Sequence, residues 1–116
     1  MNASEIQKFC KTLKGTTQGV KWGNDLCYMV GGKMYCVHNL RGSLSISFKT
    51  TPEEFGELIE RNGIIPAPYV AKHHWVLVEN PDALKKKEWE LYIQNSYALV
   101  FEKLPKKLKK EILASD

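Results

Sequence analysis

Residues 26–38 read LCYMVGGKMYCVH, and this stretch decides the fold. Two short runs of aromatic, β-branched and apolar residues flank the pair Gly31-Gly32. Because glycine tolerates the positive φ angles of a two-residue hairpin turn, the pair predicts two antiparallel strands, at 26–30 and 33–38. The next run, SLSISF at 43–48, alternates serine with apolar residues. It predicts a third strand with one buried face and one hydrated face.

Helical patterns lie on both sides of this three-stranded meander. A helix is predicted over residues 4–13, where Ser4 and Gln7 have the spacing of a capping box. A second helix is predicted to open at Thr51-Pro52, an N-cap threonine followed by proline at the first helical position, and to end at Asn62-Gly63. These two helices would pack on the meander.

The second half of the chain continues the mixed pattern. A proline-rich connector at 66–68 leads to a predicted strand at 74–78. A long amphipathic helix is predicted from about 83 to 103, and Pro105 separates it from a short basic helix at about 105–114. Antiparallel strands with helices gathered on one face predict an α+β fold. We expect residues 1–116 to form a single domain.

The composition fits one globular domain. The chain has 116 residues, of which 43% are hydrophobic and 26% are charged. No apolar run approaches the roughly 18 residues that a membrane-spanning helix needs, and the N-terminus lacks the pattern of a secretory signal. The three cysteines, Cys10, Cys27 and Cys36, have no CxxC spacing. They predict free thiols in a reducing cytoplasm.

The positive charge is concentrated near the C-terminus. The formal net charge is +4, and residues 103–116 hold five lysines against two acidic residues. The run comprises Lys103 and then Lys106, Lys107, Lys109 and Lys110. Such a run suits a nucleic-acid backbone or an anionic membrane, or is simply a solvated face. The apolar stripe beside it is thin and has no aromatic residue, which favours nucleic acid over membrane.

The sequence carries no catalytic motif that would indicate an enzyme. It has no phosphate-binding loop, no G-x-S-x-G and no H-E-x-x-H. Cys36 and His38 share a strand face, but one such pair falls short of the ligands that zinc recruits. We therefore interpret Cys36 as a small core residue and His38 as the polar end of the strand. No metal or cofactor is expected.

The segment Lys72-His73-His74-Trp75 is the most distinctive cluster. A cation, two imidazoles and an indole at the entry to a strand are typical of a nucleic-acid surface, with charge for phosphate and a ring for stacking. The alternative is that Trp75 fills the core while Lys72 and one histidine face solvent. Strand alternation leaves both readings open, because both faces of the strand carry apolar residues.

Three segments together resemble the MmcQ/YjbR family: residues 32–35, residues 66–67 leading to 72–75, and residues 96–100 with 104–107. The resemblance implies a CyaY-like (frataxin-like) α+β fold and a DNA-binding role, the latter by similarity to a double wing domain of a phage transcription factor. The family pattern marks Lys33, Pro66, Lys72, His74, Trp75, Ser96 and Tyr97. The chain departs from that pattern at Pro68 and Ala71.

The likeness to frataxins does not extend to iron binding. Iron-binding frataxins carry an acidic ridge, whereas the first predicted helix here has one acidic residue, Glu5, against Lys8 and Lys11. Hard cations need clustered carboxylates. An iron chaperone role is therefore not expected.

These observations favour a cytoplasmic, non-enzymatic DNA-binding module, with a monomer preferred. One predicted contact surface consists of Lys33, Lys72, His73, His74 and Trp75, and the other of Lys106, Lys107, Lys109 and Lys110. Because lysines make phosphate contacts and only two arginines are present to read base edges, we expect weak, salt-sensitive binding that is largely independent of sequence. Two alternatives stay open: a domain that docks an acidic protein, and a small-ligand site around Trp75, His74 and Tyr97.

Overall fold

The predicted glycine hairpin forms the centre of the fold. The computed structural model describes residues 1–115, and Asp116 lies outside the described residues. Strands β2 (Asp25–Val30) and β3 (Lys33–Asn39) pair antiparallel around Gly31-Gly32, whose φ angles are 58° and 78°. A β-bulge at Tyr35 shifts the register of this pair. The turn that the sequence predicts is confirmed.

Six antiparallel strands form one sheet. The other strands are β1 (Thr16–Lys21), β4 (Ile46–Lys49), β5 (Ile64–Pro66) and β6 (Trp75–Val78). Their spatial order is β1-β2-β3-β4-β6-β5. The sheet and the helices together confirm the predicted α+β class.

Two strands, β1 and β5, were not predicted from the sequence, and both lie at an edge of the sheet. β1 is mostly polar, and its one large apolar residue, Val20, is exposed. β5 ends at Pro66, which we expected in a rigid connector and which instead pairs with Val76 of β6. Proline is tolerated at an edge because its missing N–H faces no neighbouring strand. The third predicted strand also begins later than expected, at Ile46.

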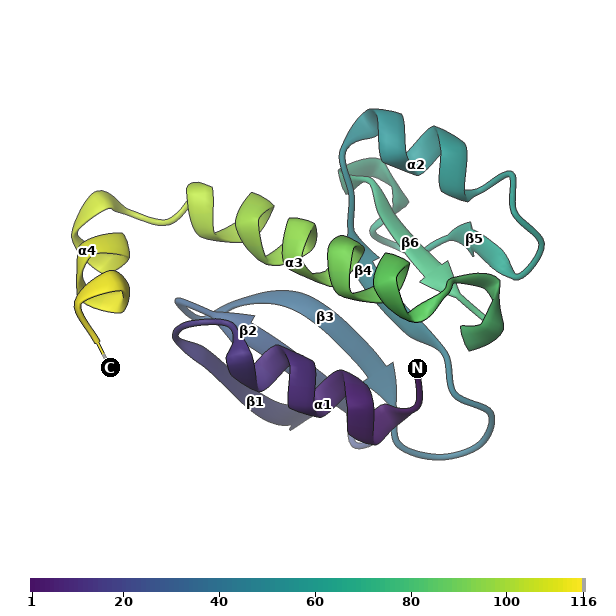
Figure 1. Cartoon of the computed structure of the whole chain (residues 1–116), viewed down its shortest axis with the longest axis horizontal. Coiled ribbons are helices and arrows are strands. Elements are labelled where there is room, and N and C mark those ends of the chain that lie inside the picture. Colours follow the sequence, from purple (N-terminus) through teal and green to yellow (C-terminus); the bar gives the residue numbers. More distant parts are fainter. Residues whose placement is uncertain (116) are drawn as a thin grey trace.

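Two of the helices cover a single face of the sheet. In Figure 1, α1 (Ala3–Thr12) and α3 (Lys86–Glu102) lie in front of the strands. The helix α2 (Pro52–Leu58) lies against β5 and β6, and α4 (Lys106–Ala114) lies at one end of the molecule. Two short 3-10 turns, η1 (Ala71–His73) and η2 (Pro81–Ala83), flank β6. The opposite face of the sheet, called the open face below, has no α-helix over it among residues 1–115.

The helix caps explain where the predicted boundaries hold and where they shift. Thr51 caps α2 as predicted, and its side chain accepts from the Glu54 N–H at 3.1 Å. The cap of α1 is Asn2 and not Ser4. The Asn2 side chain accepts from the Glu5 N–H at 2.8 Å, and the Glu5 carboxylate accepts from the Asn2 N–H at 3.1 Å. The helix α3 starts at Lys86 instead of about 83, since residues 81–83 form η2.

The core lies between the sheet and the two covering helices. Tyr28, Cys36, Phe48 and Val76 are register neighbours on four strands, and all are fully buried. The side chain of Trp89 lies against Phe48 and donates a hydrogen bond to the Pro81 carbonyl at 2.9 Å. This indole joins α3 to β4 through Phe48 and to η2 through Pro81, which supplies the partner that a buried Trp N–H needs.

Buried polar and sulfur groups complete this core. Cys10 and Cys36 belong to this core, whereas Cys27 is buried outside it, and all three thiols are free, as predicted. His38, which we interpreted as the polar end of the strand, lies one residue before the end of β3 and is buried. Its ring is satisfied there because Nε2 lies 3.0 Å from the Tyr28 hydroxyl. Within residues 1–115 no helix is long and apolar enough to cross a membrane.

Candidate functional site

The strand order brings three chemically useful side chains to one end of the sheet. In an antiparallel sheet, the start of β3, the end of β4 and the start of β6 lie at the same end. Lys33 opens β3, Lys49 ends β4 and Trp75 opens β6, and Lys49 is the register partner of Trp75. Residues separated by up to 42 positions in the sequence therefore become neighbours.

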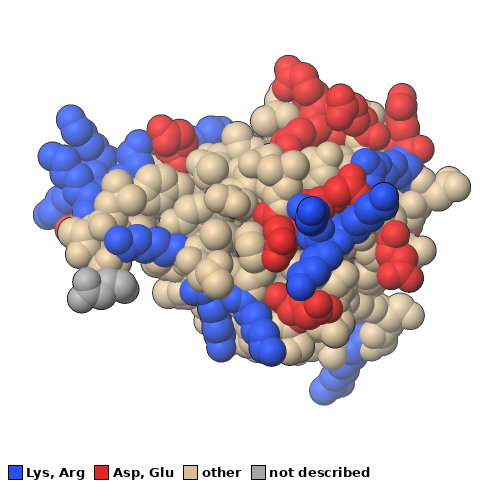
Figure 2. Space-filling model, in the orientation of Figure 1, with Lys and Arg blue, Asp and Glu red and all other residues tan. Residues whose placement is uncertain are grey.

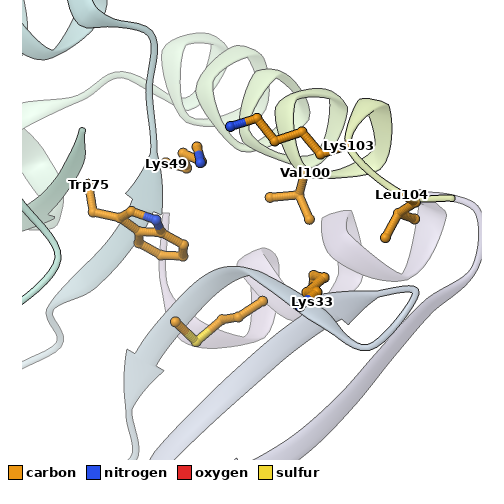
Figure 3. A pocket seen from close by; sticks show the side chains of 7 residues that line it. Lys33, Lys49, Trp75, Val100, Lys103 and Leu104 are labelled. Carbon is orange, nitrogen blue, oxygen red and sulfur yellow. The ribbon is translucent and has the colours of Figure 1, made fainter. Parts of the chain in front are cut away.

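The C-terminal end of α3 closes this end of the sheet and creates a cavity. Its volume is about 240 Å³. We call it the lysine pocket, and its lining consists of Lys33, Met34, Lys49, Trp75, Val100, Lys103 and Leu104. Figure 3 shows Lys49 and Lys103 extending into the space beside the Trp75 indole, with Lys33 below. Of the residues that the structure places in this lining, three are cationic and none is acidic.

Ser96 holds the two walls of the lysine pocket together. Its hydroxyl is buried in the middle of α3 and donates to the Tyr35 carbonyl of β3 at 2.6 Å. The same oxygen accepts from the backbone N–H of Lys49 at 2.9 Å. One side chain thus fixes α3 against both strands that carry pocket lysines. This is a structural role for a residue that the family resemblance marks.

The glycine turn supports the far wall of the pocket. Leu104 packs against Gly31, where an added Cβ atom would lie only 2.6 Å from Leu104 Cδ1. The absence of a side chain at Gly31 therefore lets the segment that follows α3 approach the hairpin closely. Lys103, next in the chain to Leu104, is held over the sheet as a result.

The electrostatics of the pocket favour an anion. Burial lowers the pKa of Lys49 below its ordinary value of 10.5, and the nearby charge of Lys103 lowers it further. In the part of the chain that the structure describes, the ion pair joins Arg61 to Glu88, with 2.8 Å between nitrogen and oxygen. Neither residue lines this cavity. Lys49 and Lys103 carry like charges at close range and repel each other, so an anion bound beside them would relieve this repulsion.

The predicted Lys72–Trp75 cluster separates in space. Lys72 and His73 belong to η1 and are exposed, whereas Trp75 is 6% exposed and lines the lysine pocket. His74 adopts a left-handed conformation with φ of 63°, and its ring lies edge-on to Phe55 of α2. The cluster divides because residues 71–73 form a 3-10 turn before the strand. Trp75 is both buried and outside the helix-covered core, since Val76 and Val78 take the core side.

The basic C-terminal helix forms as predicted but stays apart from the pocket lining. Figure 2 shows lysines gathered over α4 at one end of the molecule and acidic residues over α2 at the other. Lys106, Lys107 and Lys110 are exposed, and Lys109 donates to the Glu102 carbonyl at 3.1 Å. Leu108 and Ile112 face inward from the same helix. The two predicted contact surfaces are therefore distinct in space.

The ligand site suggested around Trp75, His74 and Tyr97 does not assemble. The Tyr97 hydroxyl donates to the Lys14 carbonyl at 2.5 Å, and its ring packs between Tyr35 and Phe101. His74 contacts α2 instead. Neither residue lines a cavity that Trp75 lines. Tyr97 thus stabilises the packing of α1 on α3.

Lys49 and Lys103 are the site residues that the sequence interpretation missed. Lys49 follows an alternating strand and Lys103 ends a long helix, so each looks like an ordinary surface lysine. One signal was available. Consecutive antiparallel strands place the start of one beside the end of the next, and this puts Lys33 beside Lys49.

One family model and two solved structures match this chain. The family model described as YjbR matches residues 11–99. A Deinococcus radiodurans protein with the domain DUF419 has a TM-score of 0.87 at 24% identity, over 99% of this chain and 90% of its own. A Pseudomonas syringae protein has a TM-score of 0.71 at 24% identity, over 86% of this chain and 99% of its own.

The two solved structures show a shared fold. No curated protein matches the chain. The family model spans most of the sequence, from the end of α1 into α3, and it includes Lys33, Lys49, Trp75 and Ser96. On this evidence the chain belongs to the YjbR family.

Proposed function

We propose that this protein binds DNA, with the phosphate backbone held by the lysine pocket. The supporting observation is the lining of this cavity, which contains Lys33, Lys49, Lys103 and the Trp75 indole and no acidic residue among those described. Three unpaired ammonium groups suit a phosphate, and the indole offers a face to a base or sugar.

The pocket suits a backbone contact better than sequence readout. Lysine is a compact point charge on a flexible stem, and it contacts phosphate without distinguishing bases. The two arginines of the chain, Arg41 and Arg61, do not line the pocket, and Arg61 is engaged with Glu88. Binding should therefore be modest in affinity and nearly independent of sequence, with a Kd of about 10⁻⁴–10⁻⁶ M at physiological salt.

Fluorescence anisotropy with labelled duplex and single-stranded oligonucleotides tests the proposal. Titrations between low and physiological salt should give a log–log slope of about −2 to −3, as expected when three lysines displace counterions. The triple variant Lys33→Gln, Lys49→Gln, Lys103→Gln should remove most of that slope and weaken binding at low salt by about tenfold or more.

A matched variant separates pocket chemistry from net charge. The triple substitution Lys106→Gln, Lys107→Gln, Lys110→Gln removes an equal number of positive charges, but from α4. It should change the slope by less than about 1, because these side chains surround no cavity. Equal losses in the two triple variants would mean that only total charge matters. No binding of either DNA form at low salt would overturn the proposal.

A further inference from the structure

A second, larger cavity adjoins the lysine pocket on the open face. Its volume is about 450 Å³, within the usual range for ligand sites, and its lining is mainly apolar. Met34 and Val37 of β3 form its floor together with Ser47 of β4. Met34 and Trp75 line both cavities, so the two lie next to each other with these side chains between them. We call the second one the aromatic cavity.

Two exposed aromatic residues stand at the rim of the aromatic cavity. Trp22, in the turn between β1 and β2, is 72% exposed, and Tyr69, in the loop after β5, is 99% exposed. Burial of an aromatic ring stabilises a fold, and neither of these rings is buried. They arise from separate turns of the chain and nevertheless line the same cavity.

The backbone at both positions is strained. Trp22 has φ of 53° and Tyr69 has φ of 69°, values that suit glycine and are uncommon for bulky side chains. Such conformations are energetically unfavourable and are concentrated at functional sites. Strain and exposure at the same two aromatic positions are two independent observations. Together they indicate that the rings are held ready for a ligand.

The charged residues around the two adjacent cavities are also separated by sign. The three lysines lie at the end where β3 and β6 begin, and Asp25 lines the aromatic cavity at the start of β2, toward the opposite end of the strands. A carboxylate repels phosphate but accepts hydrogen bonds from the amino groups of bases. The charge pattern thus orients a ligand with its phosphate toward the lysines and its base toward the aromatic rings.

We propose that the aromatic cavity binds the unpaired base of a single-stranded nucleic acid whose phosphate lies in the lysine pocket. This inference rests on the proposed DNA-binding function and specifies the form of the ligand. In a duplex the base faces are stacked and the edges paired, so no ring is free to enter a recess between Trp22, Tyr69 and Trp75. A splayed base on an aromatic side chain is the usual arrangement in single-strand binding.

The test compares a single-stranded oligonucleotide with a duplex of the same length by fluorescence anisotropy at low salt. The unmodified protein should bind the single strand at least about tenfold more tightly. The double variant Trp22→Gly, Tyr69→Gly should lose roughly 10–100-fold of single-strand affinity, in line with stacking of one or two bases. Its duplex affinity and its salt slope should stay the same, because the lysines are intact.

Glycine is the informative replacement at these positions. It suits the positive φ angles of Trp22 and Tyr69, so the variant should unfold at the same or a higher temperature, and loss of binding would not reflect loss of fold. Trp22→Phe keeps an aromatic ring and should retain most of the affinity. Leu40→Gly, an exposed apolar residue that does not line the cavity, is the control and should bind normally.

The outcomes separate this inference from the proposed function. Tighter duplex binding, or an unchanged single-strand preference in the glycine variant, would overturn the base site and leave phosphate binding at the lysines intact. Competition by polyglutamate at equal charge concentration would also overturn it, because an acidic chain would then satisfy the site without a base. Absence of all nucleic-acid binding would overturn both.

Discussion

Two groups of lysines in this protein have the same chemistry and opposite arrangements. The four on α4 are close in sequence and conspicuous there, whereas Lys33, Lys49 and Lys103 are scattered along the chain. In space the relation reverses. The scattered three converge on one cavity, and the run on α4 spreads over the solvent side of a helix, opposite Leu108 and Ile112. Charge density along a sequence is therefore a poor guide to charge density at a site.

The difference follows from how each group is supported. Lysines on an exposed helix are hydrated and free to move, and each contributes little beyond long-range attraction. The pocket lysines are fixed by strand pairing, by the Ser96 hydrogen bonds and by the seat of Leu104 on Gly31. Substitutions at these supports should affect the pocket and leave the chemistry of α4 unchanged.

The largest effect is expected at Ser96. Replacement Ser96→Ala leaves the Tyr35 carbonyl and the Lys49 N–H without their buried partner. The free energy of unfolding should fall by about 2–4 kcal/mol, since each unsatisfied buried group costs about 1–3 kcal/mol. Urea denaturation followed by circular dichroism measures this.

Ser47→Ala, on the open face, is the control for Ser96 and should change stability by no more than about 0.5 kcal/mol. An equally small effect of Ser96→Ala would show that Ser96 does not support the pocket.

A smaller effect is expected at the glycine turn, where neighbouring positions form a natural pair. Gly31→Ala should destabilise the protein by about 2 kcal/mol, because positive φ strain adds to a collision with Leu104. Gly32→Ala introduces only the positive φ strain, since no atom lies within 4 Å of its added Cβ. It should lower the free energy of unfolding by about 1 kcal/mol. Thermal unfolding of both variants gives the difference.

The two glycine variants also test whether DNA affinity depends on the position of Lys103. Gly31→Ala should also weaken DNA binding, because displacing Leu104 shifts Lys103, whereas Gly32→Ala should bind like the unmodified protein. Equal binding by both variants would argue that the position of Lys103 is unimportant.

The smallest effect is a pH dependence that belongs to Lys49 alone. Its folded pKa is lowered by burial and by Lys103, so the folded state releases its proton more readily than the unfolded state. Stability should therefore rise with pH between this lowered pKa and the ordinary value of 10.5, relative to Lys49→Gln. Denaturation at a series of alkaline pH values measures the difference. A constant difference between the two proteins would contradict the lowered pKa.

Local chemistry made part of the structure predictable. Gly31-Gly32 can hardly form anything except a hairpin turn, and Thr51-Pro52 carries every signal of a helix start, so both are confirmed. The strand β1 was missed because it is an exposed edge, held by pairing with β2 and not by its own apolar pattern. Edge strands of this kind take their conformation from their neighbour.

The candidate site was only half predictable, for a related reason. Lys33 and Trp75 stand out in the sequence, and the structure places both in the lysine pocket. Lys49 and Lys103 join them through long-range contacts, which no local pattern reveals. Lys72 failed to join because a 3-10 turn, and not an extended strand, precedes Trp75. The positions of side chains at a site depend on such short irregular segments, whose conformations local propensity specifies weakly.

The packing of Leu104 against Gly31 also couples ligand affinity to partial unfolding. The contact joins the hairpin to the segment between α3 and α4, and it spans 73 positions of the chain. The buried residue of α4 is Ile112, and segments with few buried contacts open more often than a central sheet, at a lower free energy than global unfolding. Opening of the segment between α3 and α4 would remove Leu104 and Lys103 from the lining of the lysine pocket, while β2, β3 and β4 stayed paired. Affinity would then follow the opening equilibrium of the C-terminal segment, and amide hydrogen exchange in α4 would slow when the anion binds.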